Sequence, residues 1–292
     1  MSSSRVRLVI HGGAGALPDR NYGREIGHMR GLIEAGRDRL AAGAAALDVV
    51  VETIAALEAS GLYVAGRGAS ANTGGVYELD ASLMHGPTQR AGGVASLVGF
   101  ASPIRAARAV MERTPHVLLA GSGAAEFAAR EGLEAIADPA AWFTPAWRET
   151  SSLGTAALIG TVGCLALDES GALAAGTSTG GTFGKLPGRV GDSPIIGAGA
   201  WADATAAVSC TGQGEMFLRA AVSAQIAFRM RFGGESLASA AQAALEEVRA
   251  LGGEGGLIAL SADGDIAMPY ITKGMKRACL GPGGEITVGV FE

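Results

Sequence analysis

Residues 176–180 read GTSTG, which matches the G-x-S-x-G turn that presents a nucleophilic serine, here Ser178, in α/β-hydrolases. The chain also contains LVIHGGAGAL near its start, and an HGG-type loop after an early strand supplies the oxyanion hole in many esterases of that fold. A serine of this kind needs a histidine base that follows it in the chain. The four histidines are His11, His28, His85 and His116. All of them precede Ser178, so a serine esterase is a distant alternative.

Other common chemistries lack their residues. There is no H-E-x-x-H and no C-x-x-C, which argues against a zinc site. The string GGTFGKL at 180–186 resembles a phosphate-binding loop, but it lacks the first glycine at the right spacing. Leu186 also stands where that loop needs Ser or Thr to bind magnesium. No G-x-G-x-x-G with a ribose-binding acidic residue is present, which argues against a dinucleotide site, and we expect no organic cofactor.

Composition narrows the class of protein further. The chain has 292 residues, of which 48% are hydrophobic, with a net charge of −5. No Lys- or Arg-rich stripe appears, so we expect neither nucleic acid nor membrane as a partner. Apolar runs are short or broken, and the first residues lead into a strand-like run without a signal-like segment. The three isolated cysteines, Cys164, Cys210 and Cys279, suit a reducing compartment. We therefore expect a cytoplasmic protein.

Periodicity and turn residues predict strands and paired helices in both halves of the chain. Residues 5–11 are predicted as a strand that ends at a Gly-Gly loop, 22–59 as two helices and 61–75 as a glycine-rich loop. The remaining predicted elements are a hairpin over 76–100, helices over 104–113 and 122–133, a connecting segment over 136–153, a hairpin over 161–181, a strand and one long helix over 206–232, a helix over 236–251, a hairpin over 255–271 and a closing strand over 285–292. Two sheets between helix layers would bury these elements.

Residues 160–163, GTVG, offer a different nucleophile. A threonine hydroxyl needs a positioned base, and the α-amino group of an N-terminal threonine is one solution. Its pKa of roughly 7.7–8.0 suits neutral pH. Thr161 would have this base only if the Gly160–Thr161 bond were cut, and Gly160 leaves room for attack on its carbonyl. Taken alone, GTVG is better interpreted as the β-branched start of a strand.

The residues that follow resemble a known family. TVG, TSTGG, K-x-x-GRVGDSP, GAG and TG-x-GE occur in order at 161–215, together with LVIHGGAG, ELDASLM and TKGMKRA elsewhere. This pattern resembles the plant-type asparaginase and isoaspartyl aminopeptidase family of N-terminal nucleophile hydrolases, over nearly the whole chain. The resemblance implies a four-layer αββα sandwich. It also implies self-cleavage into an α subunit, 1–160, and a β subunit, 161–292, which form one structural domain and pair as an (αβ)2 dimer.

The resemblance also implies roles for individual residues. Thr161 is the nucleophile, generated by cleavage after Gly160, and Thr179 hydrogen-bonds near it. Thr211 and the Gly212 backbone N–H form the oxyanion hole. Arg189 binds the substrate α-carboxylate and Asp192 the α-ammonium, with help from the Gly214 carbonyl; the alternative for Arg189 and Asp192 is a surface ion pair. The family further implies a sodium ion held by the backbone carbonyls of Leu57, Glu58, Ser60, Tyr63, Ala65 and Arg67.

One position departs from the family pattern. Relatives carry F-N-[AS]-G where this chain has Tyr63-Val64-Ala65-Gly66. The Val64 side chain neither donates nor accepts hydrogen bonds. We therefore expect a preference for β-aspartyl dipeptides over free asparagine, the two small-molecule substrates that the resemblance implies. A glycosylasparaginase-like amidase and a weak or inactive relative that acts as a binding protein are alternatives.

Overall fold

Two β-sheets packed face to face form the centre of the structure, a computed structural model that describes residues 5–146 and 160–291. The larger sheet has the strand order β12-β11-β1-β5-β6-β2-β3-β4, and the smaller has the order β10-β9-β8-β7. The strands of the larger sheet are β1 (Arg7–Ala14), β2 (Leu79–His85), β3 (Ala91–Leu97), β4 (Leu118–Ala120), β5 (Val162–Leu167), β6 (Leu173–Thr179), β11 (Met275–Leu280) and β12 (Ile286–Gly289). Those of the smaller sheet are β7 (Ala200–Ala202), β8 (Ala206–Gly212), β9 (Gly255–Ser261) and β10 (Ile266–Ala267).

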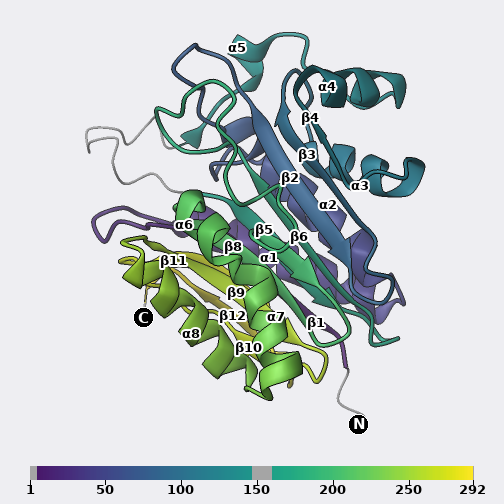
Figure 1. Cartoon of the computed structure of the whole chain (residues 1–292), viewed down its shortest axis with the longest axis vertical. Helices are drawn as coiled ribbons and strands as arrows, with labels where there is room; N and C mark the ends of the chain where they lie inside the picture. The colour runs from purple at the N-terminus through teal and green to yellow at the C-terminus, as the bar shows by residue number, and fades with distance from the viewer. Residues whose placement is uncertain (1–4, 147–159, 292) are drawn as a thin grey trace.

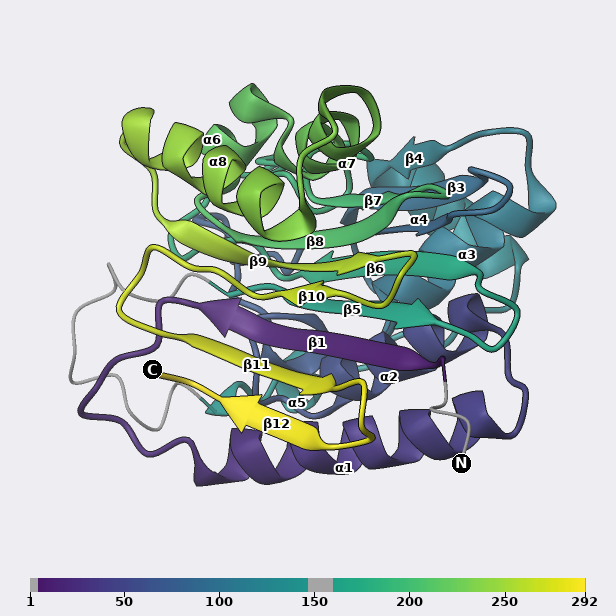
Figure 2. The same cartoon turned by 90° about the horizontal axis from the view of Figure 1, so that it is seen from below.

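Helices cover the outer face of each sheet, as Figure 1 and Figure 2 show. They are α1 (Gly23–Ala41), α2 (Ala46–Ala59), α3 (Pro103–Arg113), α4 (Gly121–Arg130), α5 (Pro139–Trp142), α6 (Gly214–Ala220), α7 (Val222–Gly233) and α8 (Leu237–Ala250), with a short 3-10 turn η1 (Gly66–Gly68). The helices α1 to α3 pack on the larger sheet, and α7 and α8 pack on the smaller one. The inner faces of the sheets meet through β1, β5, β6, β8 and β9. The predicted αββα sandwich is confirmed.

Burial explains this layering. Apolar side chains fill three zones: between the larger sheet and its helices, between the two sheets, and between the smaller sheet and its helices. Strands β1, β5, β6, β8 and β9 are buried along their whole length, as expected for strands covered on both faces. No helix in the described part of the chain is long and apolar enough to span a bilayer.

The predicted β5–β6 hairpin is confirmed, and its turn is fixed by Asp168. The carboxylate Oδ1 of Asp168 accepts hydrogen bonds from the backbone of Ser170 and Ala172, and Oδ2 accepts one from the Ala46 backbone N–H. Gly171 adopts φ +84°, which favours glycine. The turn therefore sets the hairpin register and also ties it to the start of α2.

Two predicted elements differ from the structure. The single long helix predicted within 206–232 is interrupted at Ala221, which adopts a left-handed conformation with φ 47° between α6 and α7. The first backbone N–H groups of α7, at Ser223 and Ala224, bond the carbonyls of Ala198 and Gly197 instead. This tertiary contact outweighs the helical periodicity. The connecting segment predicted over 136–153 contains the short α5, and its residues beyond 146 lie outside the described part.

Candidate active site

The β5–β6 hairpin places two of the predicted threonines side by side. Val162 pairs with Ser178 across the hairpin, so the next pair outward is Thr161 and Thr179. The Thr161 hydroxyl donates a hydrogen bond to Thr179 Oγ1 at 3.2 Å, and Thr179 Oγ1 donates to the Gly160 carbonyl at 3.1 Å. Both threonines are buried. The hydroxyl proposed as nucleophile and the carbonyl of the bond to be cut are thus linked through one side chain.

The end of β1 covers this bond. The pairing of β1 with β11 is irregular between His11 and Ala14, and the intervening residues turn over the start of β5. Gly13 adopts φ +99°, and a Cβ built on it would lie 2.9 Å from Gly160 Cα and 3.2 Å from the Thr161 nitrogen. No larger residue fits there without a shift. The Gly-Gly loop is therefore a close-fitting cover for the Gly160–Thr161 bond.

The same loop reaches the third predicted threonine. The Ala14 backbone N–H donates to Thr211 Oγ1 at 3.2 Å, one residue beyond the contact of Gly13 with Thr161. Thr211 and Gly212 end strand β8, whose neighbour across the sheet interface is β5. The structure therefore brings Thr211 to the same end of the sandwich as Thr161 and Thr179.

Arg189, Asp192 and Gly214 form a second group. Asp192 is buried, and a Cβ built on Gly214 would lie 2.8 Å from Asp192 Oδ1, so only glycine fits beside this carboxylate. Arg189 Nε donates to Glu215 Oε1 at 2.8 Å. Nη2 lies 2.8 Å from the same oxygen but is not aligned for a hydrogen bond. The buried Nη2 therefore has no hydrogen bond within the described residues, and Arg189 forms its ion pair with Glu215 rather than with Asp192.

Two buried carboxylates, Asp192 and Asp80, interact electrostatically with this guanidinium. Burial raises the pKa of Asp192 to about 7, against the opposing effect of a backbone hydrogen bond and Arg189. Burial likewise raises the pKa of Asp80 to about 6, although the Ser96 backbone N–H hydrogen bond and Lys185 oppose it. Oδ2 of each has no hydrogen-bond partner within the described residues. Asp80 pairs with Thr179 across β2 and β6 and feels the charge of Arg189, so it connects the two groups. Unpaired buried carboxylate oxygens are suited to a cationic ligand.

The loop that carries Arg189 and Asp192 is anchored by buried polar contacts. Lys185 Nζ donates to the carbonyls of Glu78 and Gly180 at 2.6 and 2.9 Å. The Glu78 carboxylate accepts from the Gly188 backbone N–H at 2.8 Å. Lys185, the lysine of the phosphate-loop-like string, therefore serves as a structural anchor between β2 and this loop.

Ser178 has a structural partner rather than a catalytic one. Its side chain is fully buried, and its hydroxyl donates to Glu58 Oε1 at 2.7 Å. Glu58 also accepts hydrogen bonds from the Ile104 backbone N–H at the start of α3 and from the Ser102 hydroxyl. Burial raises the pKa of Glu58 to about 7, with these three hydrogen bonds opposing it. The serine-esterase interpretation is therefore wrong, since Ser178 is a buried link between β6 and Glu58 of α2.

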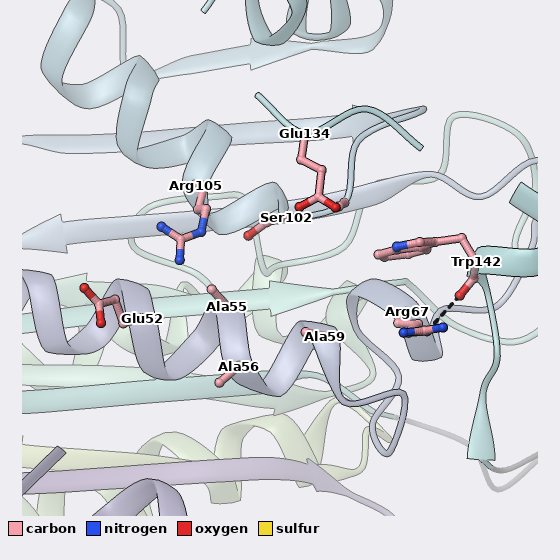
Figure 3. A pocket seen from close by; sticks show the side chains of 10 residues that line it. Glu52, Ala55, Ala56, Ala59, Arg67, Ser102, Arg105, Glu134 and Trp142 are labelled. Atoms are coloured by element: carbon pink, nitrogen blue, oxygen red, sulfur yellow. Dashed lines mark hydrogen bonds between the residues drawn. The ribbon is translucent and has the colours of Figure 1, made fainter. Parts of the chain in front are cut away.

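A surface hollow of about 440 Å³ lies between α2, the start of α3 and α5. Figure 3 shows the side chains that line it. It is lined by Glu52, Ala55, Ala56, Ala59, Arg67, Ala101, Ser102, Arg105, Glu134 and Trp142. Arg67 Nε donates to the Trp142 carbonyl across its rim. None of the threonines lines this hollow, so it is separate from the candidate active site.

The loop expected to hold sodium winds tightly after α2. A Cβ built on Gly66 would lie 2.6 Å from the Glu58 carbonyl oxygen, and one built on Gly68 only 1.9 Å from that of Tyr63. The Leu57 carbonyl accepts hydrogen bonds from the hydroxyl and the backbone N–H of Ser60, and the carbonyls of Ala65 and Arg67 accept from the backbone N–H groups of Gly68 and Thr144. The carbonyl oxygens of Glu58 and Tyr63 thus lie close to the glycines of the loop. Backbone oxygens are ligands that suit a hard cation.

Comparison with known proteins agrees with this geometry. A family model described as Asparaginase matches residues 4–156 and 145–290. A Salmonella typhimurium protein named isoaspartyl peptidase is 44% identical over 97% of this chain and 98% of its own length. An Escherichia coli isoaspartyl peptidase is 43% identical over 97% and 95%, and a Pyrobaculum calidifontis plant-type L-asparaginase is 40% identical over 94% and 97%. The chain belongs to the asparaginase family.

Val64, the residue that departs from the family pattern, lies beside Gly160. Val64 is buried, and a Cβ built on Gly160 would lie 2.7 Å from its Cγ2. The Val64 carbonyl accepts a hydrogen bond from the Gly180 backbone N–H beside Thr179. A methyl group therefore contacts Gly160 at the place where the family pattern supplies an amide.

Sequence reasoning missed several residues that contact the site. His11, Asp80 and Glu215 lie in the motifs LVIHGGAG, ELDASLM and TG-x-GE, but their partners are distant in sequence. The one local signal for His11 is its place directly before Gly12-Gly13.

Proposed function

We propose that this protein is a hydrolase that cuts itself before Thr161 and then cleaves β-aspartyl dipeptides and the side-chain amide of L-asparagine. The observation that carries the proposal is the hydrogen-bonded sequence from the Thr161 hydroxyl through Thr179 to the Gly160 carbonyl. The names of the relatives, isoaspartyl peptidase and plant-type L-asparaginase, support the substrate class.

Self-cleavage starts with attack of the Thr161 hydroxyl oxygen on the Gly160 carbonyl carbon. The bond to the Thr161 nitrogen breaks, the hydroxyl proton ends on that nitrogen, and an ester links Gly160 to the threonine oxygen. Water hydrolyses this ester and leaves residues 1–160 and 161–292 as two subunits. The hydrogen bond from Thr179 to the Gly160 carbonyl favours the charge that develops on this oxygen. The freed amine becomes the base of the mature site.

In the reaction with substrate, the Thr161 hydroxyl is again the nucleophile. Arg189 binds the substrate α-carboxylate and Asp192 the α-ammonium, and the Gly214 carbonyl supports the latter. The side-chain carbonyl of the substrate then faces Thr161, and Thr211 with the Gly212 N–H stabilises the oxyanion. Ammonia or an amino acid leaves with the proton taken from Thr161. Water then releases aspartate from the β-aspartyl ester.

The family resemblance also supports proposals for the assembly of this protein, its location in the cell and its metal ion. Two cleaved αβ units pair as an (αβ)2 dimer, and the protein works in the cytoplasm, which its three free, buried cysteines support. A sodium ion is bound by the carbonyls of Leu57, Glu58, Ser60, Tyr63, Ala65 and Arg67. Bound there, the ion would make the loop more rigid.

Sodium removal gives the first prediction. Replacing sodium with choline at equal ionic strength removes a ligand that binds only the folded protein, so we expect the melting temperature to fall. A change of about 2 °C or more, measured by calorimetry, corresponds to roughly 1 kcal/mol at this chain length. Equal melting temperatures in sodium and choline would contradict the site, and potassium serves as a control for ion size.

The substitution Val64→Asn gives the second prediction. An amide in place of the methyl group that contacts Gly160 adds a hydrogen-bonding group beside the nucleophile. We expect the ratio of kcat/KM for free asparagine to that for a β-aspartyl dipeptide to rise by about tenfold or more. Steady-state assays of both substrates measure it, with Val64→Ala as the control for lost packing. An unchanged ratio would show that Val64 does not set substrate preference.

The proposed function is tested by incubating the purified, cleaved protein with a β-aspartyl dipeptide and with asparagine. We expect equimolar aspartate and leaving amino acid from the dipeptide, with a higher kcat/KM than for ammonia release from asparagine. A protein that cleaves itself but hydrolyses neither substrate would refute the proposed activity.

A further inference from the structure

We propose that His11 is a positioning residue that holds the three threonine-bearing strands in register through a hydrogen-bond relay, with its proton fixed on Nδ1. The inference rests on the proposed function for its kinetic readout. His11 lies in β1, is fully buried and takes no direct part in the chemistry described above.

The imidazole of His11 touches the nucleophile residue itself. Its Nδ1 lies 3.1 Å from the Thr161 carbonyl oxygen, and its Nε2 lies 2.9 Å from Ser209 Oγ. The ring occupies space that Gly163 leaves open, because a Cβ on Gly163 would lie 2.3 Å from Nε2 and 2.0 Å from Ser209 Oγ. The glycine of the TVG motif therefore makes room for this ring.

The relay continues from Ser209 to the third strand. Ser209 Oγ lies 2.7 Å from Thr177 Oγ1, and Thr177 Oγ1 lies 3.0 Å from the Gly199 carbonyl oxygen. Ser209 and Thr177 are both fully buried. One ring thus connects β5 directly, β8 through Ser209 and β6 through Thr177.

Strand geometry makes these connections relevant to the site. Side chains two residues apart on a strand point to the same face. Ser209 precedes Thr211 by two residues on β8, and Thr177 precedes Thr179 by two residues on β6. A shift at either relay residue therefore moves the neighbouring threonine that faces the same way, and His11 links both to Thr161.

The partners decide which nitrogen carries the proton. The Thr161 carbonyl only accepts hydrogen bonds, so Nδ1 must be the donor. Burial lowers the pKa of His11 to about 3, with the bond to Thr161 opposing it, so the ring is neutral and Nε2 accepts from the Ser209 hydroxyl. Thr177 then donates its single hydroxyl proton to Ser209 Oγ, and the Gly199 carbonyl still accepts from the Cys210 backbone N–H. The opposite tautomer would leave two acceptors facing each other in a buried space, which is costly.

Two substitutions separate the two ring contacts. The side-chain nitrogen of Asn takes the place of Nδ1 and keeps a donor for the Thr161 carbonyl, whereas the amide group of Gln takes the place of Nε2 and keeps only the Ser209 contact. We expect His11→Gln to slow self-cleavage and to lower kcat by about 10- to 100-fold. His11→Asn recovers most of this loss. KM stays within about threefold in both variants, because Arg189 and Asp192 do not touch the relay.

The experiment follows cleavage by intact mass and then measures kcat and KM for a β-aspartyl dipeptide, with His85→Asn as the control at an exposed contact. A His11→Gln variant that cleaves and turns over at the wild-type rate would overturn the inference, and so would a His11→Asn variant that is as slow as His11→Gln. In both cases an active wild-type protein would still support the proposed function. A wild-type chain that stays whole would instead refute the proposed function.

The tautomer is measured independently of activity and of the stability of variants. In the uniformly 15N-labelled wild-type protein, the His11 ring should show a protonated Nδ1 and an unprotonated Nε2 that do not change between about pH 5 and 9. A proton on Nε2 would overturn the relay even if every variant failed to fold.

Discussion

Thr161→Ala yields a chain that stays whole and has no measurable hydrolase activity. The substitution removes the hydroxyl that the Thr179 contact links to the Gly160 carbonyl, so neither the cut nor the base amine is produced. Loss of a catalytic nucleophile costs several orders of magnitude, and we expect a fall of at least about 10⁴-fold. A denaturing gel and an aspartate-release assay measure the two losses together.

Thr161→Ser is the matched control, because serine keeps the hydroxyl and, after cleavage, the amine. We expect it to cleave and turn over, but more slowly than the wild-type protein. A Thr161→Ala chain that still splits at this bond would mean that another residue performs the attack, and full activity in the uncut variant would remove Thr161 from the mechanism.

Asp192→Asn weakens substrate binding and stabilises the folded protein at the same time. The amide cannot pair with the α-ammonium as a charge, so we expect KM to rise by about 100-fold with a smaller effect on kcat. The stabilisation follows from the raised pKa. Burial lifts the pKa of Asp192 to about 7 from roughly 3.9 in the unfolded chain.

The sign of the pH dependence is fixed by these two values. Between about pH 4 and 7 the folded state binds more protons at Asp192 than the unfolded state does, so the free energy of unfolding falls as pH rises through this window. Above pH 7 the full cost of the buried charge is present. Asparagine does not ionise, so the melting temperature of the variant should exceed that of wild type by at least about 2 °C at pH 8, with little gain near pH 4.

Calorimetry at the two pH values and Michaelis–Menten kinetics check both parts of this prediction. Asp203→Asn is the control, since Asp203 is also buried but bonds the Thr205 and Ala206 backbone in the turn before β8. We expect it to leave KM unchanged. A lower melting temperature for Asp192→Asn at pH 8 would show that the carboxylate is not strained in the free protein, and an unchanged KM would remove it from the substrate site.

Local patterns predicted most of the elements, because hairpins and amphipathic helices are specified by neighbours in sequence. The Asp168–Gly171 turn and the Pro103 start of α3 are examples. The break at Ala221 was not predictable in this way, since it depends on the carbonyls of Gly197 and Ala198. Strand β11 also went unpredicted, since its pairing with β1 spans most of the chain.

The residues of the candidate site also fall into those that motifs in the sequence predict and those that depend on distant contacts. Thr161, Thr179, Arg189 and Asp192 were predicted because motif order carries them, and the hairpin register explains why two of them meet. The relay through His11 was not predictable, because Ser209 lies 198 residues away and Thr161 lies 150 residues away. The pairing of Arg189 with Glu215 likewise appears only once the loop and α6 are placed together.

The most direct test of the central claim follows cleavage and activity in one sample of freshly purified wild-type protein. Intact mass and N-terminal sequencing are recorded at intervals beside the rate of β-aspartyl dipeptide hydrolysis. The account predicts two fragments, the second beginning with Thr161, and an activity that rises in proportion to that fragment. Activity in the whole chain, or a cut at any other bond in the active protein, would contradict it.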